Sequence, residues 1–222
     1  MLIEQVETNV YVLRDDKILG GTKKAILDEV MDPKYESYVY ASPCEGAFQV
    51  ALSIWCSENN KECHIFTPKR KETHRHTELV RINKGIIHEV SFGRLTIVQY
   101  QARLFSESNN FHYIKFGYGS DEAIDEISRR CVTAVINCDR MPTHIYCAFG
   151  SGTLYQGISQ ACASYFPEIK VVGVNVKPLQ KKCDYPCPFP CNINYDLKAW
   201  KMCHIDSLTN PENIYLFWNV SG

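Results

Sequence analysis

The order of apolar and amphipathic segments is the feature that most restricts how this chain can fold. Short apolar runs typical of buried strands alternate with longer segments whose apolar residues recur at helical spacing. The expected strands are 37–41, 64–67, 86–90, 112–116, 143–149, 170–176 and 214–220, and the expected helices are 23–30, 46–57, 72–83, 95–106, 120–137 and 152–165. Strands separated by helices in this way form βαβ units, so the sequence predicts an α/β fold with mainly parallel sheets and flanking helices.

This regular alternation ends after Pro178. Pro186, Pro188 and Pro190 alternate with cysteines there, and proline interrupts both helices and strand ladders. We therefore expect residues 181–194 to be irregular. A chain of 222 residues can form one large domain or two smaller ones, and a boundary is expected near residues 113–120.

Composition excludes several classes of protein. No apolar run approaches 18 residues, so no membrane span is expected, and residues 1–16 do not have the pattern of a secretory signal. A net charge of −1 argues against binding of polyanions by the chain as a whole. The eleven cysteines, without a signal, favour reduced thiols in a cytoplasmic protein.

The segment Gly20-Gly21-Thr22-Lys23-Lys24 opens an expected helix. Two glycines allow the backbone to turn tightly and to approach a ligand closely, which would hold a following lysine in a fixed place. Taken alone, the motif is more often a glycine turn before a basic helix start.

Two further turns lie between an expected strand and an expected helix. Ser42-Pro43-Cys44-Glu45-Gly46 is one, and Gly150-Ser151-Gly152-Thr153 is the other. Backbone N–H groups at such a turn can hold an anion at the positive end of the helix. The second turn lacks the lysine of a nucleotide P-loop, so a monophosphate suits it better, although a plain tight turn remains an alternative.

Together with Tyr195-Asp196-Leu197-Lys198, these segments resemble a known family in their order. They resemble the fold-type II enzymes that use pyridoxal 5'-phosphate (PLP), and within them the aminocyclopropane-carboxylate deaminase and D-cysteine desulfhydrase group. The family's Gly-Gly-Asn-Lys turn is matched by residues 20–23, its Ser-Asn pair by Cys44-Glu45, its phosphate loop by residues 150–153 and its Tyr-Glu-Gly-Lys segment by residues 195–198. The turn 116–119 and the last strand, 214–219, also resemble the family, so the resemblance spans residues 17–222.

The resemblance implies an architecture like that of the tryptophan synthase β subunit, with a reduced large domain. Residues 1–33 and 114–222 would form the large, PLP-binding domain, and residues 34–113 a small α/β domain. A homodimer is favoured by the same resemblance.

The resemblance also implies a cofactor and a set of site residues. PLP would be held by Lys23 as a Schiff base, and the chain would act on an amino-acid substrate through an external aldimine and a quinonoid, as lyases, deaminases and desulfhydrases do. The implied catalytic residues are Lys23, Cys44 and Tyr195, and the implied cofactor-binding residues are Lys23, Glu45, Gly46, Gly150, Ser151, Gly152, Thr153 and Asp196.

The chain departs from the family at several of these positions. Thr22 replaces asparagine, Cys44 replaces serine, Glu45 replaces asparagine and Asp196 is one methylene shorter than the family's glutamate. The connection from Pro178 to Tyr195 is also shorter. A catalytically degenerate protein that binds PLP without turnover is therefore kept as an alternative.

Two other patterns suggest different partners. A basic run lies in segment 69–84, and its members are Lys69, Arg70, Lys71, His74, Arg75, Arg81 and Lys84. It forms either a solvated helix face or a nucleic-acid contact. In the second case the enzyme would be a decarboxylase or lyase acting on an amino-acid adduct of a nucleotide or DNA base, as in phage DNA hypermodification.

A metal site is the other possibility that the sequence raises. Potential ligands are Cys183, Cys187, Cys191, Cys203 and His204. Their C-x3-C-x3-C spacing differs from the paired C-x2-C of common zinc modules, so no metal is predicted.

Overall fold

The computed structural model describes residues 1–91, 94–177 and 181–220. By its internal contacts the chain divides into two compact units, the first of Met1–Thr22 and Ser120–Gly222 and the second of Lys23–Gly119. Both units are mixed α/β with mainly parallel sheets, which confirms the predicted fold class. No helix among the described residues is long and apolar enough to cross a membrane.

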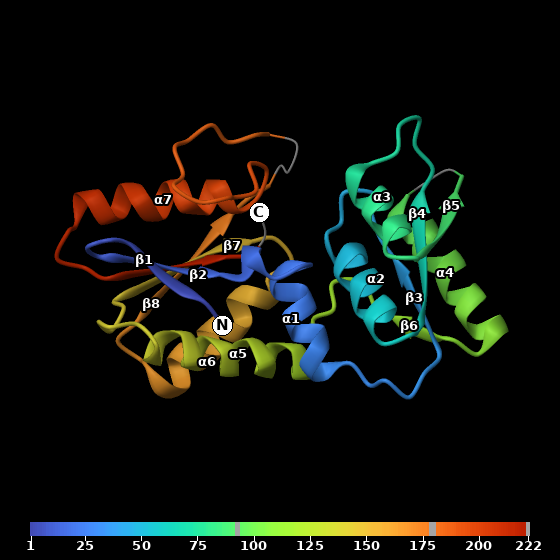
Figure 1. Ribbon diagram of the computed structural model, residues 1–222, viewed down its shortest axis with the longest axis horizontal. Coiled ribbons are helices and arrows are strands. Elements are labelled where there is room, and N and C mark those ends of the chain that lie inside the picture. Colours follow the sequence, from blue (N-terminus) through green and yellow to red (C-terminus); the bar gives the residue numbers. More distant parts are fainter. Residues whose placement is uncertain (92–93, 178–180, 221–222) are drawn as a thin grey trace. The chain divides into compact units, whose positions relative to one another are not determined.

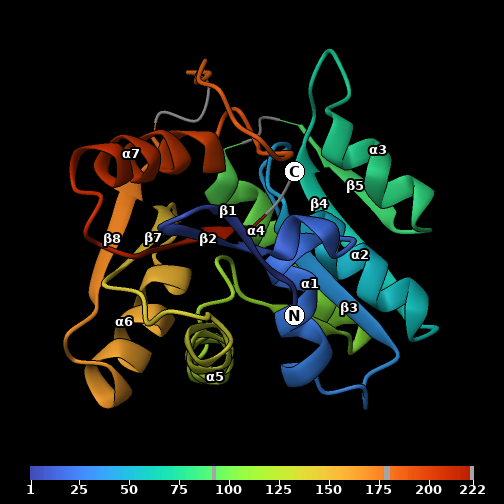
Figure 2. The ribbon, with the colours of Figure 1, turned by 60° about the vertical axis from the view of Figure 1, so that its left-hand side comes forward.

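A five-stranded sheet with the order β1-β2-β9-β7-β8 forms the centre of the first unit (Figure 1). β1 (Ile3–Glu7) pairs antiparallel with β2 (Val10–Arg14), whereas β9 (Tyr215–Asn219), β7 (His144–Phe149) and β8 (Lys170–Asn175) are parallel neighbours. Helices α5 (Asp121–Ile136) and α6 (Thr153–Tyr165) lie on one face of this sheet and α7 (Asp196–Thr209) lies on the other (Figure 2).

Side chains alternate between the two faces of this sheet along each strand, and helices cover both faces, so both sets of side chains are buried. Val12 and Phe217 pack with Trp200 of α7 in one hydrophobic cluster. Leu13 and Trp218, one position further along each strand, point to the opposite face and are also fully buried. This double burial explains why the strands read in the sequence as continuous apolar runs.

The second unit contains a four-stranded parallel sheet with the order β5-β4-β3-β6. Its strands are β3 (Ser37–Ala41), β4 (Glu62–Pro68), β5 (Ile86–Val90) and β6 (His112–Ile114). Its helices are α1 (Gly21–Val30), of which residues 23–30 belong to this unit, α2 (Phe48–Glu58), α3 (Arg75–Ile82) and α4 (Leu95–Asn109).

Two hydrophobic clusters cover the two faces of this smaller sheet. Tyr38 and Tyr40 of β3 pack with residues of α1, α2 and α3, including Trp55. Val39, between the two tyrosines, packs with Val98 of α4 on the other face. The alternation along β3 therefore determines which helices lie on which side of the sheet.

The structure also contains elements that the sequence pattern did not predict. These are β1, β2, the short 3-10 helix η1 (Asp15–Lys17) and α7. Helix α3 begins at Arg75 and not at Glu72, because the side chain of His74 accepts a hydrogen bond from the backbone N–H of His76 and caps the helix. Residues 181–194 are irregular as predicted, while residues 178–180, where the shortened connection begins, lie outside the described part.

Candidate active site

Parallel strands of the first unit end together at one edge of its sheet. Arg14, Phe149, Asn175 and Asn219 are the last residues of β2, β7, β8 and β9. Open α/β sheets bind their ligands beyond the carboxyl ends of the strands. The segment Gly150–Thr153 begins at this edge, so the fold places the predicted phosphate loop where a ligand is expected.

This loop leads directly into α6. Gly152 precedes the helix with φ +97°, a conformation that side-chain-bearing residues rarely adopt. The hydroxyl oxygens of Ser151 and Thr153 lie 3.3 Å apart at the helix start. The first N–H groups of a helix lack intrahelical partners and carry partial positive charge, so the loop has the composition and position of a small anion site.

Tyr195 lies against the first glycine of the loop. A Cβ at Gly150 would stand 2.5 Å from the Tyr195 hydroxyl oxygen and 3.0 Å from the nearest ring carbon, Cε2. Glycine is therefore required for this ring to approach the loop. Burial raises the pKa of Tyr195 well above its usual range, and the charge of Asp196 adds to the effect. The phenol is thus protonated at neutral pH.

Asp196 is the first residue of α7 and is fully buried. Its negative charge affects two neighbouring groups. Burial is the main cause that raises the pKa of the Cys147 thiol to about 12, and the charge of Asp196 is the second cause. The same two causes raise the pKa of Tyr195 above its ordinary value. A buried carboxylate favours a cationic partner, such as a protonated ring nitrogen. The predicted residues 150–153, 195 and 196 all belong to the first unit, and there the structure brings Tyr195 directly to Gly150.

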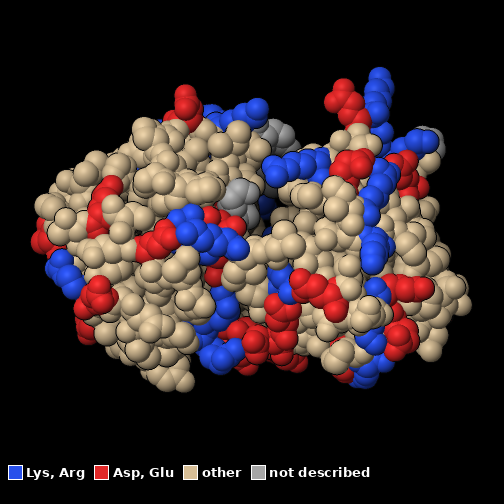
Figure 3. Space-filling view, in the orientation of Figure 1, with Lys and Arg blue, Asp and Glu red and all other residues tan. Residues whose placement is uncertain are grey.

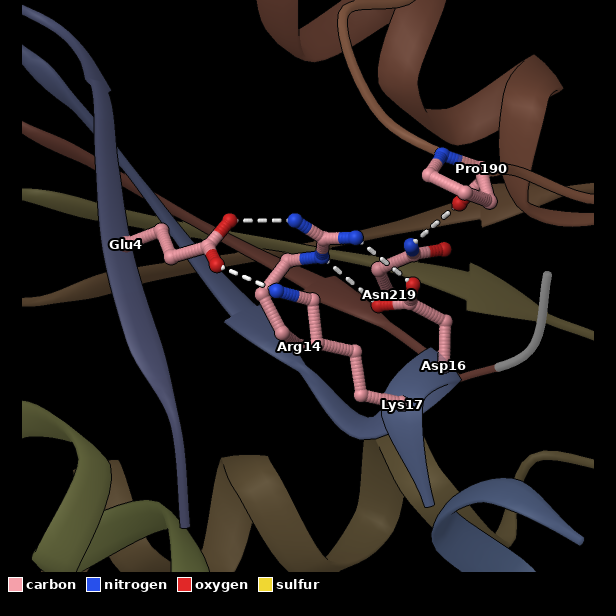
Figure 4. A network of polar contacts seen from close by, with 6 residues as sticks. All are labelled: Glu4, Arg14, Asp16, Lys17, Pro190 and Asn219. Atoms are coloured by element: carbon pink, nitrogen blue, oxygen red, sulfur yellow. Dashed lines mark hydrogen bonds and ion pairs between the residues drawn. The ribbon is translucent and has the colours of Figure 1, made fainter. Parts of the chain in front are cut away.

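A polar network fixes the same sheet edge (Figure 4). Arg14 donates two 2.8 Å hydrogen bonds to the carboxylate of Asp16 and also contacts Glu4. The hydrogen bonds to Asp16 raise the pKa of Arg14 further above its already high value. Nearby, the Asn219 amide donates to the carbonyl oxygen of Pro190 at 2.8 Å, which ties the proline-cysteine segment to the end of β9. The buried Oδ1 of Asn219 has no hydrogen-bond partner among the described residues.

A second buried network fixes the residue before Lys23. Asp15 accepts hydrogen bonds from the Thr22 hydroxyl at 2.8 Å, the Trp218 indole at 3.1 Å and Arg130 at 2.6 Å. Thr22 replaces the asparagine of the family motif, and here its hydroxyl serves to anchor the start of α1. The turn is strongly bent, with positive φ at Gly20 and Gly21 as the two-glycine motif predicted.

In the second unit, Cys44 and Glu45 follow β3 at the start of α2. The Cys44 thiol is buried, donates to the Pro68 carbonyl oxygen at 3.2 Å and accepts from the Thr67 hydroxyl at 3.3 Å. A Cβ at Gly46 would come too close to the Ser42 hydroxyl oxygen, so a larger residue there would force that side chain to shift. The thiol is thus held by two structural contacts, which does not favour the proton-handling role predicted for it.

An open pocket of about 500 Å³ lies beside this turn. It is lined by Cys44, Glu45, Arg70, Lys71, Glu72, Thr73 and His74. The basic run contributes to it, but so do two glutamates, and Arg81 forms ion pairs with Glu78 and Glu89. Figure 3 accordingly shows positive and negative side chains side by side on this unit.

One functional candidate was missed by the sequence reasoning. His76, on α3, places its Nδ1 3.0 Å from the carbonyl oxygen of Glu45. A single histidine next to a basic run carries no recognisable signal, and only the packing of α3 against the turn at Glu45 brings its ring to that turn.

The cysteines of the proline-rich segment do not form a metal site in the described structure. Cys187 and Cys191 lie in contact, so that the pKa of the Cys187 thiol is lowered by a hydrogen bond from Cys191. Tyr185 and His204 pair through a 2.9 Å hydrogen bond. Within residues 1–91, 94–177 and 181–220, no three His, Cys, Asp or Glu side chains are grouped to hold a metal ion.

Of three comparisons with known proteins, only the one with solved structures found similar proteins, and it shows the fold. No family model matches the sequence. No curated protein matches it either. Among solved structures, an ACC deaminase homologue matches with a TM-score of 0.77 at 13% identity, covering 96% of this chain and 84% of its own. An O-ureido-L-serine synthase matches with a TM-score of 0.75 at 14% identity, and the match covers 99% of this chain and 86% of the synthase chain.

A hydrogen sulfide-producing enzyme from Fusobacterium nucleatum is a third similar structure, and its match includes nearly the whole of both chains. Its TM-score is 0.66 at 14% identity, and the match covers 99% of this chain and 93% of its own. These structures share the architecture of the fold-type II PLP enzymes. At this level of identity the likeness establishes the fold. The chain therefore has the fold of the fold-type II PLP enzymes.

Proposed function

We propose that this protein is a PLP-dependent enzyme that acts on an amino acid, with lyase, deaminase or desulfhydrase chemistry. The observation that carries the proposal is the anion cradle at the start of α6, which Tyr195 approaches at Gly150 and which follows the carboxyl edge of the sheet. Solved proteins with this fold include threonine deaminase, serine racemase and diaminopropionate ammonia lyase. Each of these names gives an amino acid as the substrate.

The residues of the first unit fit PLP in two respects. The loop 150–153 offers backbone N–H groups and two hydroxyls for the phosphate, without a side chain that would fill the cradle. Asp196 offers a buried carboxylate for the pyridine nitrogen. When bound, PLP withdraws electrons from the α-carbon of an attached amino acid. Asp196 would keep the ring nitrogen protonated and so favour that withdrawal.

Lys23 is proposed as the covalent attachment site, and two other lysines are poor alternatives. Burial would lower the pKa of Lys24, but ion pairs with Asp28 and Glu58, each at 2.7 Å, outweigh this effect and raise it. A lysine held as an ammonium ion in this way is a poor nucleophile. Lys198 donates its ammonium hydrogen to the carbonyl oxygen of Val176.

The attachment site can be tested by reduction of the PLP-treated protein with borohydride, followed by peptide mapping. We expect a pyridoxyl group on Lys23. Lys23→Met should abolish labelling, whereas Lys24→Met serves as the matched control and should retain it. Labelling of Lys24 or Lys198, or no labelling of the wild-type protein, would refute the assignment.

A catalytically degenerate PLP-binding protein remains a second candidate, because the thiol of Cys44 is engaged by Pro68 and Thr67. Absorption spectra separate the two. A working enzyme bound to PLP should change its spectrum on addition of D-cysteine, aminocyclopropane-carboxylate or another amino acid, and should release product. An aminoacylated thymidine oligonucleotide, tested at low and high salt, examines the DNA-adduct alternative. A bound cofactor whose spectrum responds to none of these substrates would favour the degenerate protein.

A further inference from the structure

The buried carboxylate of Asp15 is held by donors from three different elements. Asp15 lies in η1 and is 1% exposed. Its Oδ2 accepts hydrogen bonds from the Thr22 hydroxyl at 2.8 Å and the Trp218 indole at 3.1 Å, and its Oδ1 accepts one from Arg130 at 2.6 Å. The donors belong to α1, β9 and α5, and all lie in the first unit. A carboxylate paired in this way is compensated for its burial and fixes the groups that contact it.

Thr22 is held by its side chain and by its backbone. Its hydroxyl donates to Asp15 and also accepts a hydrogen bond from the Trp218 indole at 3.1 Å, so the three side chains form a closed triangle. The backbone N–H of Thr22 donates to the carbonyl oxygen of Val220 at 3.3 Å. Thr22 is only 4% exposed. The start of α1 is therefore tied to the carboxyl end of β9.

These contacts determine where the backbone of Lys23 lies. Thr22 is the last residue of the first unit and Lys23 the first of the second, and α1 runs through both residues. Consecutive Cα atoms are about 3.8 Å apart, so a fixed Thr22 also fixes the point from which the Lys23 side chain starts. The preceding turn consists of Gly20 and Gly21, both with positive φ, and glycine has the greatest backbone freedom. The network restrains a junction that two glycines would otherwise leave mobile.

We propose that Asp15 is a positioning residue for the lysine that carries the cofactor. Through the Thr22 hydroxyl it holds the start of α1 at the carboxyl end of β9, so that Lys23 leaves the backbone at a fixed point beside this sheet edge. In this role Asp15 contacts neither cofactor nor substrate, and no proton moves through it. The role rests on the proposed function, because Lys23 is the proposed attachment site.

The first test uses the cofactor-free protein and follows hydrogen exchange of residues 18–25 by mass spectrometry. Thr22→Val keeps the shape of the side chain but removes the hydroxyl. The amides of this segment should exchange about tenfold faster, because loss of a buried hydrogen bond favours local opening. Thr22→Ser keeps the hydroxyl and should restore slow exchange. Thr133→Val, whose hydroxyl donates to a backbone carbonyl of its own helix, is the matched control and should leave this segment unchanged. Wild-type exchange in Thr22→Val would overturn the proposal.

The second test separates positioning from a general loss of structure. Absorbance measures the rate at which PLP attaches to Lys23. Thr22→Val should slow attachment about tenfold, because a displaced nucleophile reaches the reacting geometry less often, and Thr22→Ser should retain the wild-type rate. Pyridoxamine 5'-phosphate has no aldehyde and cannot attach to a lysine, so it should bind Thr22→Val as tightly as wild type. Equal losses for both ligands, or a wild-type attachment rate, would contradict the positioning role.

The third test changes Asp15 itself. Asp15→Asn keeps an oxygen that can accept from Thr22 but has no charge for the ion pair with Arg130. It should slow attachment, and the double variant with Thr22→Val should be no slower than the slower single variant, because both changes break one network. Additive effects would show that Asp15 does not act through Thr22. If wild type attaches no PLP, the proposed function fails, and the exchange experiment then decides by itself whether the network holds the start of α1.

Discussion

At the scale of single residues, the proposed role of Asp196 rests on the place of its carboxylate in the fold. The sequence motif Tyr-Asp-Leu-Lys gave its position, and the structure shows that it is fully buried at the start of α7. A buried carboxylate at this position fits the proposed contact with a cationic ring nitrogen of the cofactor.

Asp196→Asn tests this role. The amide has the same shape but no charge, so PLP should still bind, while turnover of any responsive amino acid should fall about tenfold or more because the ring nitrogen loses its fixed counter-charge. Turnover and PLP affinity are measured together. Asp206→Asn, on the same helix but bonded to Tyr146 and Asn210, is the control for α7. Equal turnover in Asp196→Asn and wild type would argue against the assignment.

At the scale of elements, the turn from β7 into α6 packs against the residue before α7, so a change in one constrains the conformation of the other. The ring of Tyr195 occupies the space that a side chain at Gly150 would need. Two segments more than forty residues apart in the sequence therefore meet at one point of the candidate site. Neither segment alone predicts this contact.

Gly150→Ala should disturb the loop through this contact. Its Cβ would lie 2.5 Å from the Tyr195 hydroxyl and 3.0 Å from the ring, so the ring or the loop must move. We expect PLP affinity to fall about tenfold, which corresponds to about 1.4 kcal/mol. Equilibrium titration followed by absorbance measures this.

A second substitution makes that test specific. Tyr195→Phe in the Gly150→Ala background removes the closest contact and should recover part of the affinity, whereas Tyr195→Phe alone should change it little. If Gly150→Ala binds PLP as tightly as wild type, the loop at Gly150 does not contribute to cofactor binding.

At the scale of the whole molecule, several partly buried histidines make the stability of the protein depend on pH. Burial is the main cause of a lowered pKa at His76, His88, His112 and His144. His88 also lies 3.0 Å from the ring nitrogen of His64, a contact that requires a neutral partner as acceptor. Between the lowered pKa and the ordinary value near 6.5, the unfolded chain binds more protons than the folded chain, so stability decreases as pH falls through this range.

The melting temperature should therefore fall between pH 7.5 and pH 5.5 at constant ionic strength. For a protein of this size, each 1 kcal/mol of lost stability lowers it by about 2–4 °C. Circular dichroism measures the change. The triple variant His88→Gln, His112→Gln and His144→Gln should have a smaller pH dependence than wild type. A melting temperature that rises on acidification would show that other groups dominate.

Much of the fold follows from local patterns in the sequence. The strands of the second unit and helices α5 and α6 were predicted because apolar residues recur at strand or helix spacing and caps mark their ends, such as Ser120 before α5. Helix α7 was missed because its buried face includes Asp196, Ala199 and Ser207, which give little apolar periodicity. The strand β2 was missed because a short N-terminal apolar run is recognisable only once it pairs with β9.

The sequence by itself determined the α/β class and the order of the glycine-rich turns, because periodicity and backbone freedom are local properties. Only the tertiary structure decided which side chains meet: Tyr195 against Gly150, Thr22 with Asp15 and Trp218, and His76 with Glu45. Apart from the contact of Thr22 with Asp15, seven residues away, these contacts join residues that packing brings together across long stretches of chain. Their geometry depends on the whole core, and no local pattern encodes it.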